Sequence, residues 1–293
     1  MNKDLLEKYN WIRHGGAGYY QPKRGLIAVW GKESVQFLNG LITNDVAKLE
    51  DGAQMVAAFP NAQGRLLAVV RVRREGERFL FETEESTREK VFNNLFRFTF
   101  AGDFFAEDWS GKYVYFSIEN GPWKMDNQDI IQFGKDLFVL NEAIEDFKHQ
   151  LSKAVEISDE LYEVLRIEQG IPLYGVDMDE TTIVPELGLE GLISYNKGCY
   201  IGQEIIARIY FRGHVAKQLR GLVLSGVESE LQNTEIKTLE GKNAGRITSV
   251  VYSPRLEKNI ALGYVRNDYL AEGTELKLGE TMAIVKDLLF FAN

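Results

Sequence analysis

This chain of 293 residues contains a single cysteine, three histidines and six prolines. A single cysteine excludes an internal disulfide, and the histidines are too widely spaced for a metal-binding motif, so we expect no metal site. No apolar run approaches the roughly 20 residues that a membrane-spanning helix needs. The first residues are not followed by the apolar core of a signal peptide. We therefore expect a cytoplasmic protein that does not enter the membrane.

The chain also has few positive charges, with 34 lysines and arginines against 43 aspartates and glutamates, a net charge of −9. A broad electrostatic footprint for nucleic acid is absent, although a local basic patch remains compatible with this balance. Hydrophobic residues make up 45% of the sequence and charged residues 26%, as in soluble globular proteins. The length predicts about two domains.

Helical and alternating apolar patterns are mixed along the first half of the chain, which predicts the α+β class. Residues 65–73 alternate well and form, with 55–59, a hairpin around the turn 60–64. Ser86 and Glu89 have the spacing of a capping box that would open a helix. The other expected elements are helices at 3–12, 32–41, 143–151 and 159–169, and strands at 24–31, 78–83, 112–118, 130–133 and 137–140.

Beyond residue 214 the sequence pattern changes to short strands separated by turns, which predicts a small β-barrel. The six expected strands are 218–224, 236–239, 244–252, 259–266, 275–278 and 280–285. We therefore divide the chain into residues 1–214, with two interleaved α+β lobes, and a barrel domain at 215–293.

The only cysteine lies in the most distinctive stretch of the chain, residues 197–204, which reads Lys-Gly-Cys-Tyr-Ile-Gly-Gln-Glu. An amphipathic run begins at Ile205, so we expect Cys199 near a helix N-terminus. Backbone N–H groups there favour anions, and Lys197 adds a positive charge, so the thiolate would form more readily. Cys199 is thus a candidate catalytic thiol, with Lys197 as its support. The alternative is that Cys199 is a small buried hydrophobic residue.

A carboxylate falls on the apolar face of the helix predicted over 159–169. Leu161 and the residues three and four positions later define that face, and the residue seven positions later is Glu168. Burying a lone carboxylate costs several kcal/mol, so Glu168 must find a partner, keep a proton or meet a ligand. The alternatives are a ligand-binding carboxylate and a structural one that pairs with Arg166 or lies in an exposed last turn.

The long irregular segment 171–186 follows this helix. Segments of this length in compact domains are usually functional or disordered, and its apolar content argues against disorder. We expect it to line a site, with Tyr174 as a candidate cofactor contact. Asp177, Asp179 and Glu180 only loosely resemble a cation site, and a solvated acidic turn is the preferred interpretation.

Several of these stretches, in this order, resemble the YgfZ-type folate-binding proteins, relatives of the glycine-cleavage T-protein. The similarity extends over nearly the whole chain, and the cysteine motif is its most specific part. The stretches are Arg24-Gly25-Leu26, residues 37–46 (Phe-Leu-Asn-Gly-Leu-Ile-Thr-Asn-Asp-Val), 64–67 (Gly-Arg-Leu-Leu), 165–172 (Leu-Arg-Ile-Glu-Gln-Gly-Ile-Pro), 197–204 and Ser253-Pro254.

The resemblance implies a three-lobed ring with a C-terminal β-barrel, and tetrahydrofolate or a one-carbon derivative as the cofactor. The T-protein glutamate that holds the pterin ring matches Glu168. A carboxylate can accept two parallel N–H bonds from the pterin edge, which would relieve its burial penalty. Arg65 and Arg208 are lesser candidates for the glutamate tail of folate, and both are equally compatible with a role as surface charges.

One departure from the T-protein separates two functions. Where the T-protein carries an aspartate that supports methylene transfer, this sequence has Ala68, between Leu67 and Val69. None of these side chains can transfer a proton, which disfavours an aminomethyltransferase. The resemblance thus implies a folate-binding accessory protein that assists assembly or repair of iron–sulfur clusters in client proteins, with links to tRNA-modifying iron–sulfur enzymes. The alternatives are a one-carbon transferase that uses another acid or base, and a ligand-free scaffold.

Overall fold

The computed structural model describes residues 2–121, 129–226 and 234–291, and these residues form two compact units. One unit contains Asn2–Ser158 and Glu190–Gln203; the other contains Asp159–Leu189 and Glu204–Asn293. The expected α+β class with a C-terminal barrel is confirmed. In the described part of the chain, no helix is long and apolar enough to cross a membrane. The division into domains 1–214 and 215–293 remains a prediction.

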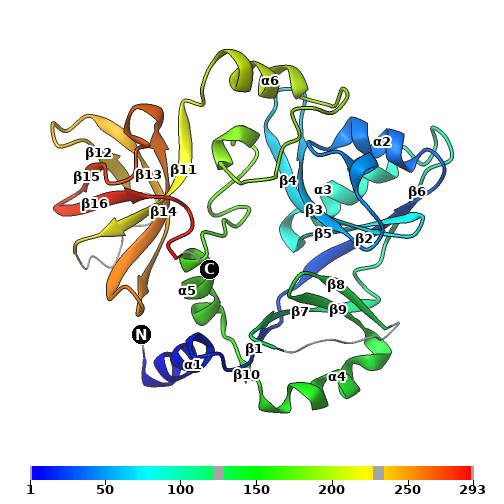
Figure 1. Ribbon diagram of the computed structural model, residues 1–293, viewed down its shortest axis with the longest axis horizontal. Coiled ribbons are helices and arrows are strands. Elements are labelled where there is room, and N and C mark those ends of the chain that lie inside the picture. The colour runs from blue at the N-terminus through cyan, green and yellow to red at the C-terminus, as the bar shows by residue number, and fades with distance from the viewer. Residues whose placement is uncertain (1, 122–128, 227–233, 292–293) are drawn as a thin grey trace. The chain divides into compact units, whose positions relative to one another are not determined.

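The first unit is built on two five-stranded sheets, drawn from blue to green in Figure 1. Its helices are α1 (Lys3–Arg13), α2 (Ser34–Leu41), α3 (Glu85–Phe96) and α4 (Ile144–Gln150). In spatial order, the strands of one sheet are β3 (Gln54–Pro60), β4 (Leu66–Glu75), β5 (Arg78–Glu84), β2 (Arg24–Trp30) and β6 (Phe105–Asp108). Those of the other are β10 (Val155–Glu156), β1 (Gly18–Tyr20), β7 (Tyr113–Glu119), β9 (Asp136–Leu140) and β8 (Ile130–Phe133).

Alternation along the strands sorts the side chains of this unit into three apolar layers. In β2, Ile27 joins the core beneath α2 and α3, whereas its neighbour Leu26 faces the second sheet. In β7, Tyr115 faces the first sheet, and Phe116 packs on Phe147 of α4. The order of layers is therefore helices, sheet, sheet, helix. The predicted hairpin of β3 and β4 is confirmed.

The expected capping box at Ser86 is wrong. Helix α3 begins at Glu85, so Ser86 lies within its first turn, and Glu84 is the capping residue. Strand β5 ends at Glu84, so the strand continues directly into the helix with no connecting residue. The hydroxyl of Thr87 lies 2.7 Å from that of Thr83 and donates to the Glu84 carbonyl at 3.1 Å.

The second unit is built on a closed six-stranded barrel, drawn from yellow to red in Figure 1. Its strands, in order around the barrel, are β11 (Lys217–Leu224), β14 (Lys258–Arg266), β13 (Asn243–Ser253), β12 (Glu235–Lys237), β15 (Glu275–Leu278) and β16 (Thr281–Lys286). The unit also contains α5 (Asp159–Glu168), the short helix η4 (Val184–Leu187) and all but the first residue of α6 (Gln203–Arg212). Each predicted barrel strand is present.

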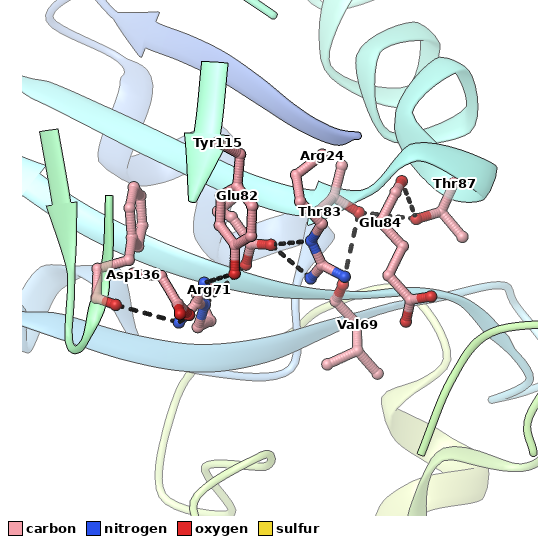
Figure 2. A network of polar contacts seen from close by, with 10 residues as sticks. Arg24, Val69, Arg71, Glu82, Thr83, Glu84, Thr87, Tyr115 and Asp136 are labelled. Carbon is pink, nitrogen blue, oxygen red and sulfur yellow. Dashed lines mark hydrogen bonds and ion pairs between the residues drawn. The ribbon is translucent and has the colours of Figure 1, made fainter. Parts of the chain in front are cut away.

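A buried ionic network connects the two sheets of the first unit (Figure 2). Glu82 of β5 accepts from Nε of Arg24 at 2.5 Å and from Nε of Arg71 at 2.7 Å. Arg71, on β4, also donates to Asp136 of β9 at 2.6 Å and to the hydroxyl of Tyr115 at 3.3 Å. Burial alone would raise the pKa of Glu82, but the charges of Arg24 and Arg71 outweigh it and the pKa is lowered.

We expect Glu82→Gln to lower the free energy of unfolding by roughly 3 to 5 kcal/mol, because it leaves two arginines at the sheet interface without their counter-charge. Urea unfolding followed by circular dichroism measures the change. The control is Glu107→Gln, which removes an exposed pair with Lys112 and should cost less than about 1 kcal/mol. Equal unfolding midpoints for Glu82→Gln and the unaltered protein would contradict this role of the network.

Candidate functional site

Residues 190–203 return to the first unit and pack beside the loop that follows α2. The hydroxyl of Thr43 donates to the carbonyl of Leu192 at 2.6 Å, and Ser194 N–H donates to the carbonyl of Thr43 at 3.0 Å. The Asn44 amide donates to the carbonyls of Gly191 at 2.8 Å and Val56 at 2.9 Å. Thr43 and Asn44 thus hold a segment that is distant in sequence. Both residues belong to the stretch 37–46, which resembles the YgfZ-type proteins.

Lys197 fastens the middle of this segment. Its Nζ donates to the carbonyl of Ile42 at 2.8 Å and to that of Asn44 at 2.6 Å, and lies 5.1 Å from the ring centroid of Tyr200. Burial lowers the pKa of Lys197 to about 8, against the opposing effect of the Asp45 charge. A neutral amine still has two N–H groups, so both carbonyl bonds can persist when the proton is lost.

The residues after Cys199 attach the segment at a second place. Ile201 N–H donates to the carbonyl of Gly40 at 3.0 Å, and the Ile201 side chain packs on the core beneath α2. Gly202 has a φ of +79° and lies against the turn 61–64, where an added Cβ would meet the carbonyl oxygen of Asn61 at 2.4 Å. Only glycine satisfies both the backbone conformation and the close approach.

Cys199 is exposed between these two attachments, so the alternative of a buried hydrophobic side chain is wrong. It lies four residues before the start of α6 at Gln203. Tyr200, its neighbour, is buried, and burial raises the pKa of the Tyr200 hydroxyl to about 12. The chain therefore presents a thiol to solvent on a short segment that is fixed on both sides.

Arg65 belongs to the same unit as Cys199. The Arg65 side chain is exposed, and the backbone N–H of Arg65 donates to the side-chain oxygen of Asn61 at 3.0 Å. This hydrogen bond lies in the turn that contacts Gly202. The fold thus brings the turn of Arg65 beside the cysteine segment. Ala68 of β4 is fully buried in the core with α2 and α3, and its neighbours Leu67 and Val69 are half-buried.

Glu168 is the last residue of α5 in the second unit, and it is only 1% exposed. The hydroxyl of Ser253, at the end of β13, donates to its Oε1. The structural alternative of an exposed last turn is therefore wrong. Arg166 has other partners, Glu163 at 2.6 Å and Asp177 at 2.9 Å. Glu168 is a buried carboxylate oriented by a hydroxyl.

We expected Asp177, Asp179 and Glu180 to form a solvated acidic turn, and this expectation is wrong for Asp177. Asp177 is buried and paired with Arg166, whereas Asp179 and Glu180 are exposed. Among the described residues, no group of three or more His, Cys, Asp or Glu side chains is placed to hold a metal. Tyr174, half-buried, forms an isolated bridge with Met178 in this turn, and Arg208 is exposed on α6.

Sequence reasoning named the acidic residues of the second unit but missed the hydroxyls that bind them. Ser253 lies in a stretch that carries the resemblance, yet nothing in the pattern paired it with Glu168. Thr248 and Ser249, which bind Asp177, lie in a predicted strand where consecutive side chains normally point to opposite faces. Pairing across more than 70 positions of sequence has no local signal.

We expect Gly202→Ala to destabilise the first unit by about 1 to 3 kcal/mol, because alanine must adopt a positive φ and approach the Asn61 carbonyl. Gly198→Ala is the matched control, since nothing lies within 4 Å of an added Cβ there. Urea unfolding measures the stability, and the rate of thiol labelling at Cys199 reports whether the segment has loosened. Equal stability and equal labelling rates in the two variants would contradict the inference that Gly202 fixes the cysteine segment against the turn 61–64.

Comparisons with known proteins agree with this architecture. Residues 217–282 match the glycine cleavage T-protein C-terminal barrel domain. The aminomethyltransferase of Desulfitobacterium hafniense is 24% identical over 96% of this chain and 85% of its own, and that of Thermotoga neapolitana is 28% identical over 89% and 81%.

A crystal structure of the glycine cleavage system aminomethyltransferase T from Bartonella henselae has the same fold. It covers 98% of this chain and 89% of its own with a TM-score of 0.88 at 20% identity. The matched barrel domain and the common fold therefore show that this chain has the architecture of a glycine cleavage T-protein.

Proposed function

We propose that this protein binds tetrahydrofolate, or a one-carbon derivative of it, and assists the assembly or repair of iron–sulfur clusters in client proteins of the cytoplasm. These clients would include tRNA-modifying iron–sulfur enzymes, as the YgfZ-type resemblance implies. The relatives named aminomethyltransferase support the folate part of the proposal. The cluster part rests on the cysteine motif and on the residues at positions 67–69.

The observation that carries the folate proposal is the buried carboxylate of Glu168 at the end of α5. A carboxylate has about four acceptor positions, and the Ser253 hydroxyl occupies one of them on Oε1. Acceptors of this kind fit the 2-amino and ring N–H edge of a pterin, which offers parallel donors. Tyr174 and Arg208 belong to the same unit as Glu168 and remain candidate contacts for the rest of the cofactor. Arg65 remains a candidate only through the resemblance.

The residues near Ala68 favour an accessory role over methylene transfer. Leu67, Ala68 and Val69 carry no group that can give or take a proton, and Ala68 is enclosed in an apolar core. The one-carbon transferase remains the second candidate function, because the relatives reported above are named aminomethyltransferases. A transferase would need an acid or base from another part of the chain.

Cys199 is the group that we assign to the cluster chemistry. An exposed thiol can ligate an iron–sulfur cluster transiently or resolve an oxidised sulfur species. Lys197 holds the segment through two carbonyl bonds, and it thereby supports the position of Cys199. Attachment on both sides keeps the thiol in one place for a client.

We expect Glu168→Gln to weaken tetrahydrofolate binding by about 1 to 3 kcal/mol, because a charged hydrogen-bond acceptor is lost. Anaerobic isothermal titration calorimetry of the purified protein measures the affinity. Glu160→Gln, an exposed substitution in the first turn of the same helix, is the control and should bind normally. Unchanged affinity in Glu168→Gln would place the pterin elsewhere, and no binding by the unaltered protein would favour a ligand-free scaffold.

We expect Cys199→Ser to keep the fold and the folate affinity but to abolish function in cells that lack the native protein. Complementation is measured as the activity of iron–sulfur enzymes in those cells, and the same protein is titrated with tetrahydrofolate. Full rescue by the serine variant would refute the thiol mechanism. Turnover of tetrahydrofolate with a methylamine donor by the unaltered protein would instead support the one-carbon transferase.

A further inference from the structure

Strand β13 contains a bulge at the place where it faces α5. Its pairing with β14 shifts register between Ile247, which pairs with Gly263, and Ser249, which pairs with Leu262. Thr248 is therefore the additional residue. Ile247 belongs to the barrel interior, whereas the hydroxyls of Thr248 and Ser249 both bind one carboxylate outside it. In a regular strand these neighbours would point to opposite faces.

That carboxylate is Asp177, which gathers donors from three elements. Its Oδ1 accepts from the Thr248 hydroxyl at 2.5 Å and from the Ser249 hydroxyl at 2.6 Å. Its Oδ2 accepts from Nη1 of Arg166 at 2.9 Å and from the N–H of Leu173 at 3.0 Å. Because both oxygens are used, Asp177 fixes α5, the turn after it and β13 in one arrangement.

Arg166 connects Asp177 to the residues at the end of α5. Its guanidinium also donates to the Ser249 hydroxyl at 3.0 Å and to the carbonyl of Ile171 at 3.0 Å. The N–H of Ile171 in turn donates to the carbonyl of Arg166 at 2.8 Å. Arg166 and Ile171 are thus joined by two hydrogen bonds, which fix the last turn of the helix. Glu168 lies within that turn.

The same strand reaches Glu168 directly. Ser253, which donates to the Glu168 carboxylate, follows Ser249 by four residues and shares its face of β13. One strand therefore restrains the end of α5 at two points, one through Arg166 and one through the carboxylate itself. A buried ion pair is weak evidence for stability, but several directional bonds at one helix end do fix its geometry.

We propose that the bulged strand β13 positions Glu168 for the pterin, with Thr248 and Ser249 acting through Asp177 and Arg166 as positioning residues. The inference rests on the proposed folate function and adds a specificity element to it. Two parallel bonds to a pterin edge require a carboxylate of defined orientation. The bulge supplies this because it aims two consecutive hydroxyls at Asp177.

The experiment is a double-mutant cycle on tetrahydrofolate affinity, measured by anaerobic calorimetry with the full chain. Thr248→Val keeps the side-chain shape and removes only the hydroxyl, and it is made alone and together with Glu168→Gln. Ser249→Ala is the second variant if Thr248→Val does not fold. The matched control is Thr281→Val, another buried barrel threonine, and urea unfolding of every variant separates stability from affinity.

We expect Thr248→Val to weaken tetrahydrofolate binding about tenfold, and to have no further effect in the Glu168→Gln background, since it acts through that carboxylate. Thr281→Val should bind normally. Unchanged affinity in Thr248→Val, or an equal loss in both backgrounds, would overturn the inference while the folate proposal stands. No binding by the unaltered protein would overturn the folate proposal and this inference with it.

Discussion

Three carboxylates that the fold removes from water, Glu82, Asp177 and Glu168, determine how the elements of each unit are joined. A buried charge costs several kcal/mol unless partners are fixed around it. Glu82 meets this requirement with arginines from β2 and β4, and Asp177 meets it with donors from α5, a turn and β13. The partners come from different elements, so satisfying the charge also sets the positions of those elements.

Glu168 likewise joins two elements, because the hydroxyl of Ser253 on β13 donates to the Oε1 of this residue at the end of α5. Under the proposed function its carboxylate would have a second task that Glu82 and Asp177 do not share. It would also accept N–H groups from the edge of a pterin.

The cysteine segment illustrates a different constraint, the exposure of a reactive group on a rigid support. Residues on either side of Cys199 are bound to the loop after α2 and to the turn 61–64, while the thiol itself remains open to solvent. A common fold does not determine chemistry, and residues 67–69 carry only apolar side chains that pack in or beside the core of the first unit.

The sequence by itself determined the elements whose signals are local. The alternation of β4, the apolar stripe of α5 that ends at Glu168 and the six short barrel strands were all predictable, because side-chain periodicity reports which face is buried. The resemblance carried by the motifs likewise indicated the barrel and the candidate residues Cys199 and Glu168.

Only the tertiary structure decided how distant residues meet. The burial of Asp177, the bulge that turns Thr248 and Ser249 toward it, and the exposure of Cys199 depend on contacts between segments far apart in sequence. The start of α3 was also missed, because β5 runs into it without the break that a capping residue normally marks. Local patterns specify which residues leave water, but the partners that compensate buried polar groups are chosen by the packing of the whole unit.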